Sequence, residues 1–583
     1  MTAPTTEVAL SRPDLAPIPG PLDGTFYDLV ETRFRRLVHD NPLLGTFLGI
    51  HTEDDRLGDG SRDALLAELD ADRAHLAKVE ALDVDGLSDE ARFERELEIH
   101  NLRRAIFDTD VLRRWERRST ALDVVGDALF LLFARDFAPL DERLDSIAGR
   151  LECLPSYLDE HRTRRRGLPV RIWEQLEIDS ARELPAFIDE IVAAAAGSNG
   201  RPALANTERR RLERAADRAR PAIADYQSWL ESTLGKATDE WAIGCDRYDE
   251  LIGLRAFDGL DADAILDIGV RQLDESRRAR AEAAHEIEPN ATETEVIDRV
   301  KSNHPATFDE ALVAYRKAMF RARQHLVERD IVTVPDDERL EVVRTPDYLQ
   351  EVIPFAAYFE PPKFDRQPSG IYIVTPAVRK NPTAMREHNY ASISNTSIHE
   401  AYPGHHLQLA VAAKHPSLTR ILVDAPEFVE GWGMYSELMM REHGFDDGPT
   451  FRLAMHTDAI WRACRIILDI RMHRGEIGVE EAVDFLVRET AFEEANARAE
   501  VYRYTYTPTY QLSYLLGRVL LLQLRADERR RLGDAFSLRE FHDTLLSNGS
   551  LPISFHRRLL ATNDTRSRAG GGSSAKPRSR AAK

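Results

Sequence analysis

The sequence predicts a mainly α-helical protein that has two helical lobes and a small antiparallel β-sheet beside the helix carrying its most reactive motif. Apolar residues recur at helical spacing from Phe26 to about residue 330. Short β-prone segments follow between residues 339 and 376, and helical spacing returns from about Asn395 to about residue 560. A chain of 583 residues is longer than one hydrophobic core usually serves, which favours two lobes over one.

The composition excludes several classes of protein. Apolar residues make up 43% of the chain and aromatic residues 8%, which is enough for a large core and rules out general disorder. The formal charge is −21, from 99 acidic and 78 basic residues. Nucleic acids and anionic membranes bind to basic surfaces, so we expect neither of them as the main partner.

The cysteines and the start of the chain indicate a compartment. Cys153, Cys245 and Cys464 are far apart and odd in number, which is typical of reduced thiols and gives no disulfide framework. The first residues lack the basic and apolar regions of a signal peptide, and no apolar run reaches the ~18 residues of a membrane span. We therefore expect a cytoplasmic protein, and its oligomeric state is left open.

The expected organisation is an arm, a helical body and a tail. Residues 1–22 are rich in Pro and Thr and are expected to form a flexible N-terminal arm. Residues 23–335 are expected to form a largely helical lobe, and residues 336–563 to hold the sheet and the helices of the reactive motif. Residues 564–583 are expected to be a disordered basic tail, because from Thr565 onward they include six basic and no acidic residues. Such a tail suits a solvated terminus or contact with RNA or another acidic surface.

Three segments predict the sheet. Each is short, rich in β-branched or aromatic residues, and bounded by Pro or Gly. They are RLEVVRTP at 339–346, FAAYFEPP at 355–362 and GIYIVTP at 370–376.

The segment SIHEAYPGHHLQLAV, residues 397–411, carries the most informative motif. Asn395 and Ser397 are suitable N-cap residues for a helix that begins there. A His followed directly by Glu begins the HExxH signature of zinc hydrolases, in which two histidines bind the metal and the glutamate activates water. His399 is therefore a candidate zinc ligand and Glu400 a candidate general base.

The second histidine departs from this signature, because the position four residues after His399 is Pro403. His406 shares a helix face with His399 but lies about two turns along, which is too far for one zinc ion at ~2.0–2.1 Å from each ligand. The Pro-Gly pair at 403–404 permits a local break that brings His405 next to His399. We therefore expect His405 to be the second ligand and His406 to support the site or pack beside it.

The third ligand is expected in FVEGWGMYSELMM, residues 428–440. Glu430 lies 25 residues after His405, and Glu437 lies seven residues further on the same helix face. A catalytic zinc site needs three protein ligands and one open position, and Glu430 completes that set. Glu437 suits the role of accepting a hydrogen bond from a ligand histidine.

The pairing of HEAYPGHHLQ with VEGWGMYSE resembles the bacterial family catalogued as domain of unknown function 885. Members of that family resemble gluzincin metallopeptidases with helical bodies. The resemblance extends from about Phe26 to Leu560 and includes NPLLGTFLGIH near the start and EVYRYTYTPTYQLSYLLG toward the end. It implies a two-lobed, gluzincin-like fold around a zinc ion. The substrate of the family is generally unassigned.

The resemblance also bears on individual residues. It supports Glu430 over Glu437 as the third ligand and His405 over His406 as the second. It implies that the strand Gly370–Val374 is an edge strand that pairs with the backbone of the substrate.

Hydrolysis of an amide also requires a hydrogen-bond donor for the oxyanion. The segment EVYRYTYTPTYQLSYLLG offers Tyr504, Tyr510 and Tyr514, any of which could equally be a packing residue. A pattern of the family matches this segment at Arg503, Tyr504, Pro508, Tyr514 and Gly517. The resemblance thus makes Tyr504 and Tyr514 the leading donors.

The segment RACRIILDIRMH places Arg465, Asp469 and His473 on one helix face. They could face a cleft, where they would bind a substrate carboxylate or support the metal ligands, with His473 as a further catalytic candidate. The alternative is a buried ion pair between helices, and the sequence does not decide between the two.

Together these residues predict a zinc-dependent hydrolase that cleaves the amide bond of a short peptide or another small amide, with Glu400 activating the water. Two alternatives remain open. The same zinc site could hydrolyse a non-peptide metabolite, or the chain could be a zinc-binding helical scaffold without turnover.

Overall fold

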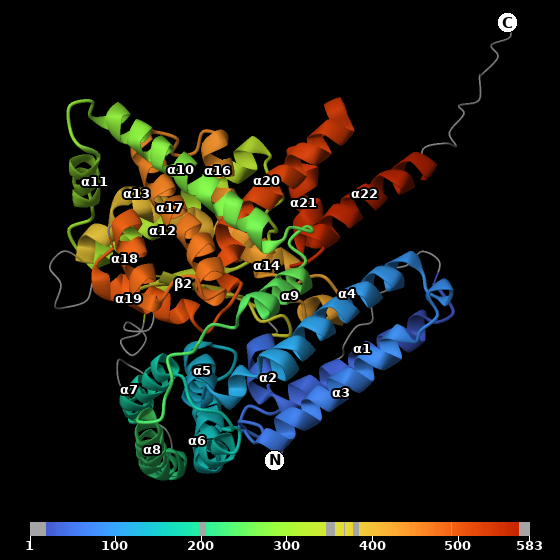
Figure 1. Ribbon diagram of the computed structural model, residues 1–583, viewed down its shortest axis with the longest axis vertical. Helices are drawn as coiled ribbons and strands as arrows, with labels where there is room; N and C mark the ends of the chain where they lie inside the picture. Colours follow the sequence, from blue (N-terminus) through green and yellow to red (C-terminus); the bar gives the residue numbers. More distant parts are fainter. Residues whose placement is uncertain are drawn as a thin grey trace, which may run out of the picture.

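The computed structural model describes residues 19–197, 206–345, 356–365, 368–376, 384–490 and 492–570, with the backbone alone for residue 206 and residues 562–570. It confirms a mainly helical protein with a small sheet. The helices of roughly the first 235 residues occupy the lower part of Figure 1, and the later helices occupy the upper part.

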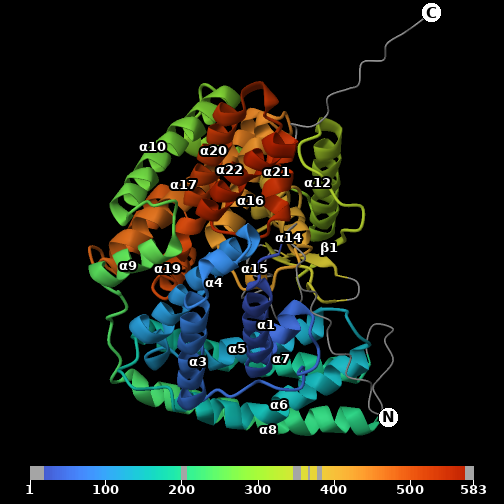
Figure 2. The same cartoon turned by 90° about the vertical axis from the view of Figure 1, so that its right-hand side faces the viewer.

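The first group of helices begins at Asp23, as the apolar spacing predicts. Its members are α1 (Asp23–Asp40), α2 (Pro42–Leu48), α3 (Arg62–Glu80), α4 (Asp89–Phe107), α5 (Ala121–Ala134), α6 (Leu140–Arg162), α7 (Arg171–Ala195) and α8 (Asn206–Leu234), with the short turns η1 (Val84–Gly86), η2 (Asp108–Leu112) and η3 (Arg114–Glu116) between them. The helices α6 and α8 run side by side along the lower edge of Figure 2. Leu151, Ile188 and Tyr226 from α6, α7 and α8 are fully buried in the core that these helices share.

The second group contains the candidate site. Its helices are α9 (Cys245–Arg255), α10 (Ala262–Ile287), α11 (Glu293–Ser302), α12 (Phe308–Arg329), α13 (Tyr390–Glu400), α14 (His405–Ala412), α15 (Leu418–Ile421), α16 (Pro426–Glu442), α17 (Pro449–His473), α18 (Val479–Thr490), α19 (Glu494–Tyr504), α20 (Ser513–Leu532), α21 (Leu538–Ser547) and α22 (Ile553–Gly570), with the short turns η5 (Ala384–His388), η6 (Tyr510–Leu512) and η7 (Gly533–Ala535). The long pairs α10/α17 and α16/α20 are in close contact within this group, and α10 lies along its left edge in Figure 2.

The division between the two cores differs from the expected boundary near residue 335. Most buried apolar residues of α5 to α8 form one core, whereas Trp241 and Ile265 belong to the same core as Trp432 and Leu521. The helices α9 to α12 therefore belong largely with the site-bearing helices, because α10 buries its apolar face against α17. Amphipathic spacing identifies each helix but does not say which partner covers its apolar face.

The helices α16 and α20 approach each other at a pair of glycines. A Cβ atom on Gly431 would lie 2.6 Å from the Cα of Gly517, and a Cβ atom on Gly517 would lie 2.0 Å from the carbonyl oxygen of Glu427. No side chain larger than hydrogen fits at either position, so the two backbones are in direct contact.

The sheet contains β1 (Leu340–Arg344), β2 (Ala356–Phe359) and β3 (Gly370–Val374), which fall within the three predicted segments. Its order is β1-β3-β2, with β1 parallel and β2 antiparallel to β3. The prediction of an antiparallel sheet is therefore wrong for the β1/β3 pair. The prediction that Gly370–Val374 is an edge strand is also wrong, because both of its edges are hydrogen-bonded to neighbours, which leaves none for a substrate.

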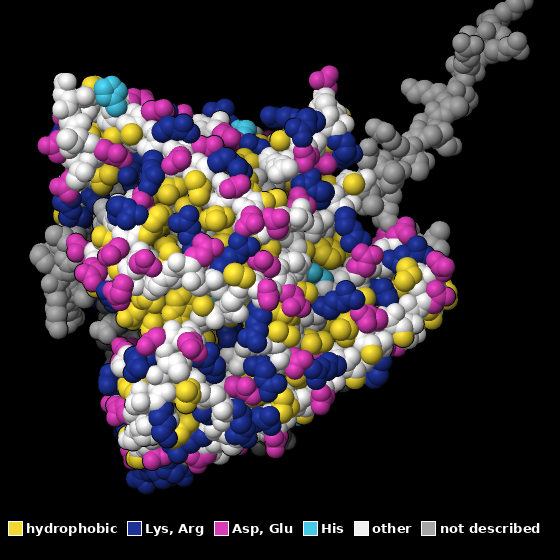
Figure 3. Space-filling view, in the orientation of Figure 1, with side chains coloured by type: hydrophobic (Ala, Val, Ile, Leu, Met, Phe, Trp, Pro, Cys, Tyr) yellow, Lys and Arg dark blue, Asp and Glu magenta, His cyan; other side chains and the backbone are white. Residues whose placement is uncertain are grey.

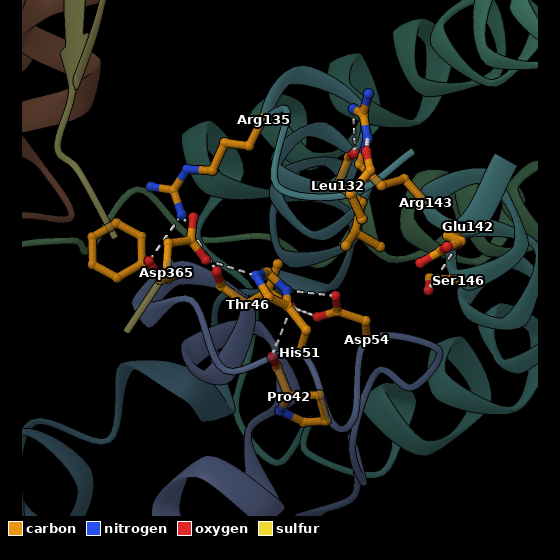
Figure 4. Close-up of polar contacts among 12 residues, drawn as sticks. Pro42, Thr46, His51, Asp54, Leu132, Arg135, Glu142, Arg143, Ser146 and Asp365 are labelled. Carbon is orange, nitrogen blue, oxygen red and sulfur yellow. Dashed lines mark hydrogen bonds and ion pairs between the residues drawn. The ribbon is translucent and has the colours of Figure 1, made fainter. Parts of the chain in front are cut away.

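An ionic contact ties the first group of helices to the chain that follows β2 (Figure 4). The ring of His51, just after α2, lies between two carboxylates: Nδ1 is 2.7 Å from Oδ2 of Asp54, and Nε2 is 2.9 Å from Oδ1 of Asp365. Burial alone would lower the pKa of His51, but the hydrogen bonds to Asp365 and Asp54 raise it to about 9. Gly49, with φ of 84°, lets the chain pass within contact of Asp365.

The ends and the surface complete the description. The expected arm and tail lie mostly outside the described residues, but α22 continues to Gly570 and so includes the first part of the predicted disordered tail. Within the described part of the chain, no helix combines the length and the low polarity that crossing a bilayer requires. The face shown in Figure 3 carries acidic and basic side chains interspersed with one another.

Candidate metal centre

The HE motif lies at the end of a helix, which corrects the expectation that it begins one. The helix α13 starts at Tyr390, where Asn389 is the N-cap and its side chain accepts a hydrogen bond from the backbone N–H of Ser392. Asn395, expected as a cap, instead donates to Glu437 and Asp458 at 2.9 and 2.8 Å. The HE pair, residues 399–400, is therefore in the last turn of α13.

The Pro-Gly pair produces the predicted break between α13 and α14. Pro403 has no N–H to continue the helix. A Cβ atom on Gly404 would lie 1.8 Å from the carbonyl oxygen of His399, so only glycine fits there. Trp432 of α16 donates from its indole N–H to the carbonyl oxygen of Pro403 at 2.7 Å and fixes the break against the neighbouring helix.

This break brings the imidazoles of His399 and His405 together, with ring centroids 4.7 Å apart and ring planes perpendicular. Glu430, in the first turns of α16, directs Oε2 toward both rings, 3.6 Å from Nε2 of His399 and 3.3 Å from Nε2 of His405. All three candidate ligand atoms lie within 4.8 Å of one another. Three ligands at ~2.0–2.1 Å from a tetrahedral ion lie about 3.3–3.4 Å apart, so the spacing fits zinc.

Glu437 and Gly433 determine the orientation of His399. Glu437 accepts a hydrogen bond from Nδ1 of His399 at 2.7 Å, as the sequence predicts, and this leaves Nε2 free to face Glu430. A Cβ atom on Gly433 would lie 2.7 Å from the ring of His399, so the ring packs directly on the backbone of α16. The other ring nitrogen of His405, Nδ1, is buried and makes no hydrogen bond to any described residue.

His406 points away from this cluster. Its Nε2 lies 2.7 Å from Oε2 of Glu338, and its Nδ1 lies 3.0 Å from the hydroxyl of Tyr358 on β2. Because both ring nitrogens already have partners, His406 links α14 to the sheet region and has no nitrogen left for a metal. This geometry favours His405 over His406 as the second ligand.

The charges in the cluster shift several pKa values. Burial alone would lower the pKa of His399, but its hydrogen bonds to Glu430 and Glu437 raise it to about 10. Burial would raise the pKa of Glu430, but the two histidines hold it well below its usual range. Burial raises the pKa of Glu400, against the opposing effect of the nearby charges of His405 and His399. A raised carboxylate pKa beside a candidate metal site suits a group that takes up a proton.

Tyr510 reaches the cluster, whereas Tyr504 does not. The hydroxyl of Tyr510 donates to Oε1 of Glu430 at 2.9 Å and lies 3.4 Å from the hydroxyl of Tyr514. Tyr504 is fully buried and donates instead to Glu500 at 2.9 Å, a contact that does not favour it as an oxyanion donor, so that role stays a prediction. Tyr514 stays a candidate at the edge of the site. Tyr510 is among the three possible donors that the sequence offers, and its spacing of four residues from Tyr514 is the signal that would have ranked it above Tyr504.

The three polar residues of α17 hold the segment that carries Tyr510. Arg465 pairs with Glu500 at 2.8 Å, Asp469 accepts from the backbone N–H of Thr509 at 2.7 Å, and His473 lies 2.9 Å from the carbonyl oxygen of Tyr504. Burial raises the pKa of Asp469 to about 7 and lowers that of His473 to about 4.

The structure therefore corrects the role predicted for His473. Its ring is fully buried, stacks on Tyr248 and contacts the edge of Trp241, so it is not a catalytic group at this site. Of the two alternatives for α17, the ion pair between helices applies to Arg465. Asp469 and His473 position the loop that ends at Tyr510.

A cavity of about 360 Å³ opens beside the cluster, and Glu430 and Tyr510 line it. Its opposite wall includes Phe47 of α2, together with Glu360 and Lys363 from the segment that follows β2. The ammonium group of Lys363 donates to the backbone carbonyl of His415 at 2.7 Å, which fixes this wall. Neither this wall nor the Glu338 carboxylate beside His406 had a signal in the sequence, because both come from segments remote from the motif.

Comparison with known proteins agrees with the fold. A family model described as "Bacterial protein of unknown function (DUF885)" matches residues 42–560. A "putative lipoprotein of unknown function" from Shewanella oneidensis is 23% identical, with a TM-score of 0.75 over 92% of this chain and 99% of that one. A "putative lipoprotein" from Colwellia psychrerythraea is 18% identical, with a TM-score of 0.81 over 93% of this chain and 99% of that one. No curated protein matches the chain.

The two solved structures show that this fold recurs in other bacteria, and at these identities they show the fold alone. Both of those proteins are described as lipoproteins. The cytoplasmic location expected for this chain stays a prediction.

Proposed function

The chain belongs to the bacterial DUF885 family, and from this premise we propose that it is a zinc-dependent, gluzincin-like hydrolase that cleaves amide bonds in short peptides. One observation carries the proposal: three side chains from two separate motifs place candidate ligand atoms within 4.8 Å of one another, and one of them, Glu430, lines a cavity. Their spacing of 3.3 and 3.6 Å suits a single tetrahedral ion.

His399, His405 and Glu430 would hold the ion, and the donor set of two imidazoles and one carboxylate is typical of zinc peptidases. A bound zinc ion supplies Lewis acidity that polarises a carbonyl group and acidifies water. Glu437 keeps His399 in the tautomer that presents Nε2 to the ion.

Glu400 is the proposed general base. It is partly exposed at the end of α13, next to both histidines, and burial raises the pKa of its carboxyl. It would take a proton from the attacking water and pass it to the leaving amine. Tyr510 and Tyr514, whose hydroxyls lie 3.4 Å apart, are the proposed donors to the oxyanion.

The size of the cavity supports a small substrate. A volume of about 360 Å³ accommodates a few amino-acid residues and excludes a folded protein chain. A non-peptide amide would fit the same cavity, so peptide and non-peptide substrates are separated by a substrate screen.

Metal analysis of the purified protein tests the site directly. We expect about one zinc per chain in the unaltered protein and only traces in His399→Ala and Glu430→Ala. The control is Glu442→Ala, which removes a carboxylate from the far end of the same helix, where it pairs with Arg525 at 2.9 Å. This variant should retain its zinc. Equal metal in all four proteins would contradict the proposal.

The variant Glu400→Gln separates an enzyme from a scaffold. A general base contributes a factor of ~10²–10⁴ to the rate, so we expect that loss of turnover on a peptide mixture while zinc stays bound. The measurement is release of new amino termini, followed alongside the zinc content. Turnover unchanged in this variant would favour a different base, and no turnover in the unaltered protein on peptides or small amides would favour a scaffold.

A further inference from the structure

A second cavity, of about 430 Å³, adjoins the one beside the metal cluster. Its wall includes five arginines: Arg104, Arg114, Arg118, Arg164 and Arg255. Only two acidic residues, Asp108 and Asp424, line it with them. This excess of positive charge runs against the formal charge of the whole chain, which is −21.

The arginine cavity and the metal cavity share lining residues. Tyr510 and Asp424 belong to the walls of both. The loop from Tyr506 to Tyr510 therefore separates them: Tyr510 donates to Glu430, while the ring of Tyr506 lies 4.0 Å from the guanidinium carbon of Arg118. A ligand that passes Tyr510 would contact both the metal cluster and the arginines.

The carboxylates near this cavity do not neutralise it. Asp424 is shared between Arg104 and Arg255 at 2.9 and 3.2 Å, and Asp108 pairs with Arg114 at 2.7 Å. Arg118 pairs with Asp123, outside the lining, at 3.0 Å. Three carboxylates thus form ion pairs with four of the five arginines. The buried carboxyl of Glu427 also lies within electrostatic range of Arg255 and Arg104, but burial raises its pKa to about 7, so it offsets their charge only in part.

Arg164, just after α6, accounts for much of this excess. Its Nε donates to the carbonyl oxygen of Gly60 at 2.6 Å, and it has no carboxylate partner among the described residues. The side chain is half-buried, and burial lowers its pKa. Glu68 and Asp59 act on Arg164 only at longer range, so an anion in direct contact would offset the cost of burying this cation.

We propose that the arginine cavity binds a carboxylate of the substrate and so selects anionic peptides. This inference rests on the proposed function, because it places the reacting amide of the same molecule at the metal cluster. Guanidinium groups bind carboxylates through paired, charge-assisted hydrogen bonds, which makes arginine the suitable residue for this role. The carboxylate can belong to the C-terminus of the peptide or to an acidic side chain.

Binding can be tested without turnover. The probe is a mixture of random tetrapeptides, offered to the full-length Glu400→Gln protein in equilibrium dialysis and counted by mass spectrometry. One mixture has free C-termini, a second is amidated and free of acidic residues, and a third is amidated with one Asp or Glu per peptide. We expect the first mixture or the third to bind at least about tenfold more tightly than the second, and more weakly at high salt. The preferred mixture identifies the source of the carboxylate.

Two variants with opposite expected effects on peptide binding test whether the binding depends on the arginine cavity. Arg164→Gln should weaken binding of the preferred mixture by about tenfold, because it removes one charged hydrogen-bond donor. Asp424→Asn should strengthen it, because it removes the carboxylate that Arg104 and Arg255 share. Arg166→Gln, an exposed arginine two residues further along the same segment, is the matched control and should change nothing.

The outcomes separate the two proposals. Equal binding of all three mixtures, no binding of any, or equal effects of the Arg164 and Arg166 variants would overturn the arginine cavity as a carboxylate site, even if the unaltered protein hydrolyses peptides. Carboxylate-dependent binding without turnover in the unaltered protein would leave the cavity assigned and would contradict the hydrolase.

Discussion

Two clusters of polar residues lie in the second group of helices and differ in where their side chains point. The convergent cluster is His399, His405 and Glu430, whose donor atoms face one point. The divergent cluster is the α17 set, Arg465, Asp469 and His473. Each contains histidine and a carboxylate in helices, so residue type does not distinguish them.

Their contacts do distinguish them. The divergent cluster sends each side chain to a different part of the segment between Glu500 and Thr509, which it holds against α17. The convergent cluster places Oε2 of Glu430 at 3.3 and 3.6 Å from the Nε2 atoms of His405 and His399, a spacing that suits an ion between them. Convergence on one point is therefore the criterion that separates a binding site from a structural polar cluster.

The largest expected effect compares one histidine from each cluster. His405→Ala should reduce bound zinc from about one per chain to a trace, because a two-ligand site holds zinc poorly. His473→Ala should keep its zinc and lose about 1–3 kcal/mol of unfolding free energy, because it removes a buried hydrogen bond. Metal analysis and urea unfolding measure the two effects. Loss of zinc from both variants would break the comparison.

A third arrangement, in which a histidine lies between two carboxylates, predicts a dependence on pH. The pKa of His51 in the folded protein is about 9, above the value of 6.5 for the unfolded chain. Its contribution to stability is therefore complete below pH 6.5 and is lost as the pH rises through 9. At about 1.4 kcal/mol for each pH unit, the whole window amounts to about 3 kcal/mol.

Urea unfolding between about pH 6 and about pH 10 measures this contribution as a difference between the unaltered protein and His51→Gln. The difference should be largest at the acidic end of this range and close to zero at the alkaline end. A difference that is the same at every pH would show that Asp54 and Asp365 do not hold His51 as a cation.

The next effect tests whether zinc binding depends on a residue that orients a ligand without being one of the three ligands itself. Glu437→Gln should weaken zinc binding by about 10–100-fold, because Glu437 orients His399 through its Nδ1. Ser436→Ala, at the neighbouring buried position of α16, is the control and should bind zinc normally. Competition with a zinc chelator gives both affinities. Equal affinities would mean that His399 needs no such support.

The smallest effect compares two tyrosines, Tyr504 within the segment that α17 holds and Tyr510 directly after it. Tyr510→Phe should lower turnover by about tenfold, because its hydroxyl bonds to a ligand carboxylate. Tyr504→Phe should change turnover by less than about twofold and cost about 1 kcal/mol of stability, because its hydroxyl bonds to Glu500 and Arg465 and not to a candidate metal ligand. The reverse order of the two turnover values would move Tyr504 into the site.

The parts of the site that could be predicted from the sequence are those encoded locally. The break at Pro403 and Gly404 and the choice of His405 follow from backbone chemistry over a few residues. The structure has the break, which brings the ring of His405 beside that of His399. The Glu437 contact follows from helical spacing, since Glu430 and Glu437 are two turns apart on α16. Local spacing also predicts the helices and the three strands.

The remaining parts depend on contacts between distant segments. The order of the strands, with β3 in the centre, follows from pairing that the segments themselves do not encode. The sequence misplaces the start of α13 because Asn389 and Asn395 are equally good caps by type, and only the contact of Asn395 with Glu437 decides between them. It places Tyr504 and His473 in the site because helical periodicity predicts which residues share a helix face, but not which part of the molecule that face contacts.

The paired glycines of α16 and α20 have a mechanical consequence. Because Gly431 and Gly517 bring the two backbones into direct contact, no layer of side chains lies between the helices at this point to let one slide along the other. The two helices, one carrying Glu430 and the other Tyr514, should therefore move as one rigid unit. Any widening of the cavity beside Glu430 should therefore come from other lining residues, such as 47 and 363. These two residues belong to segments that the His51 contact joins.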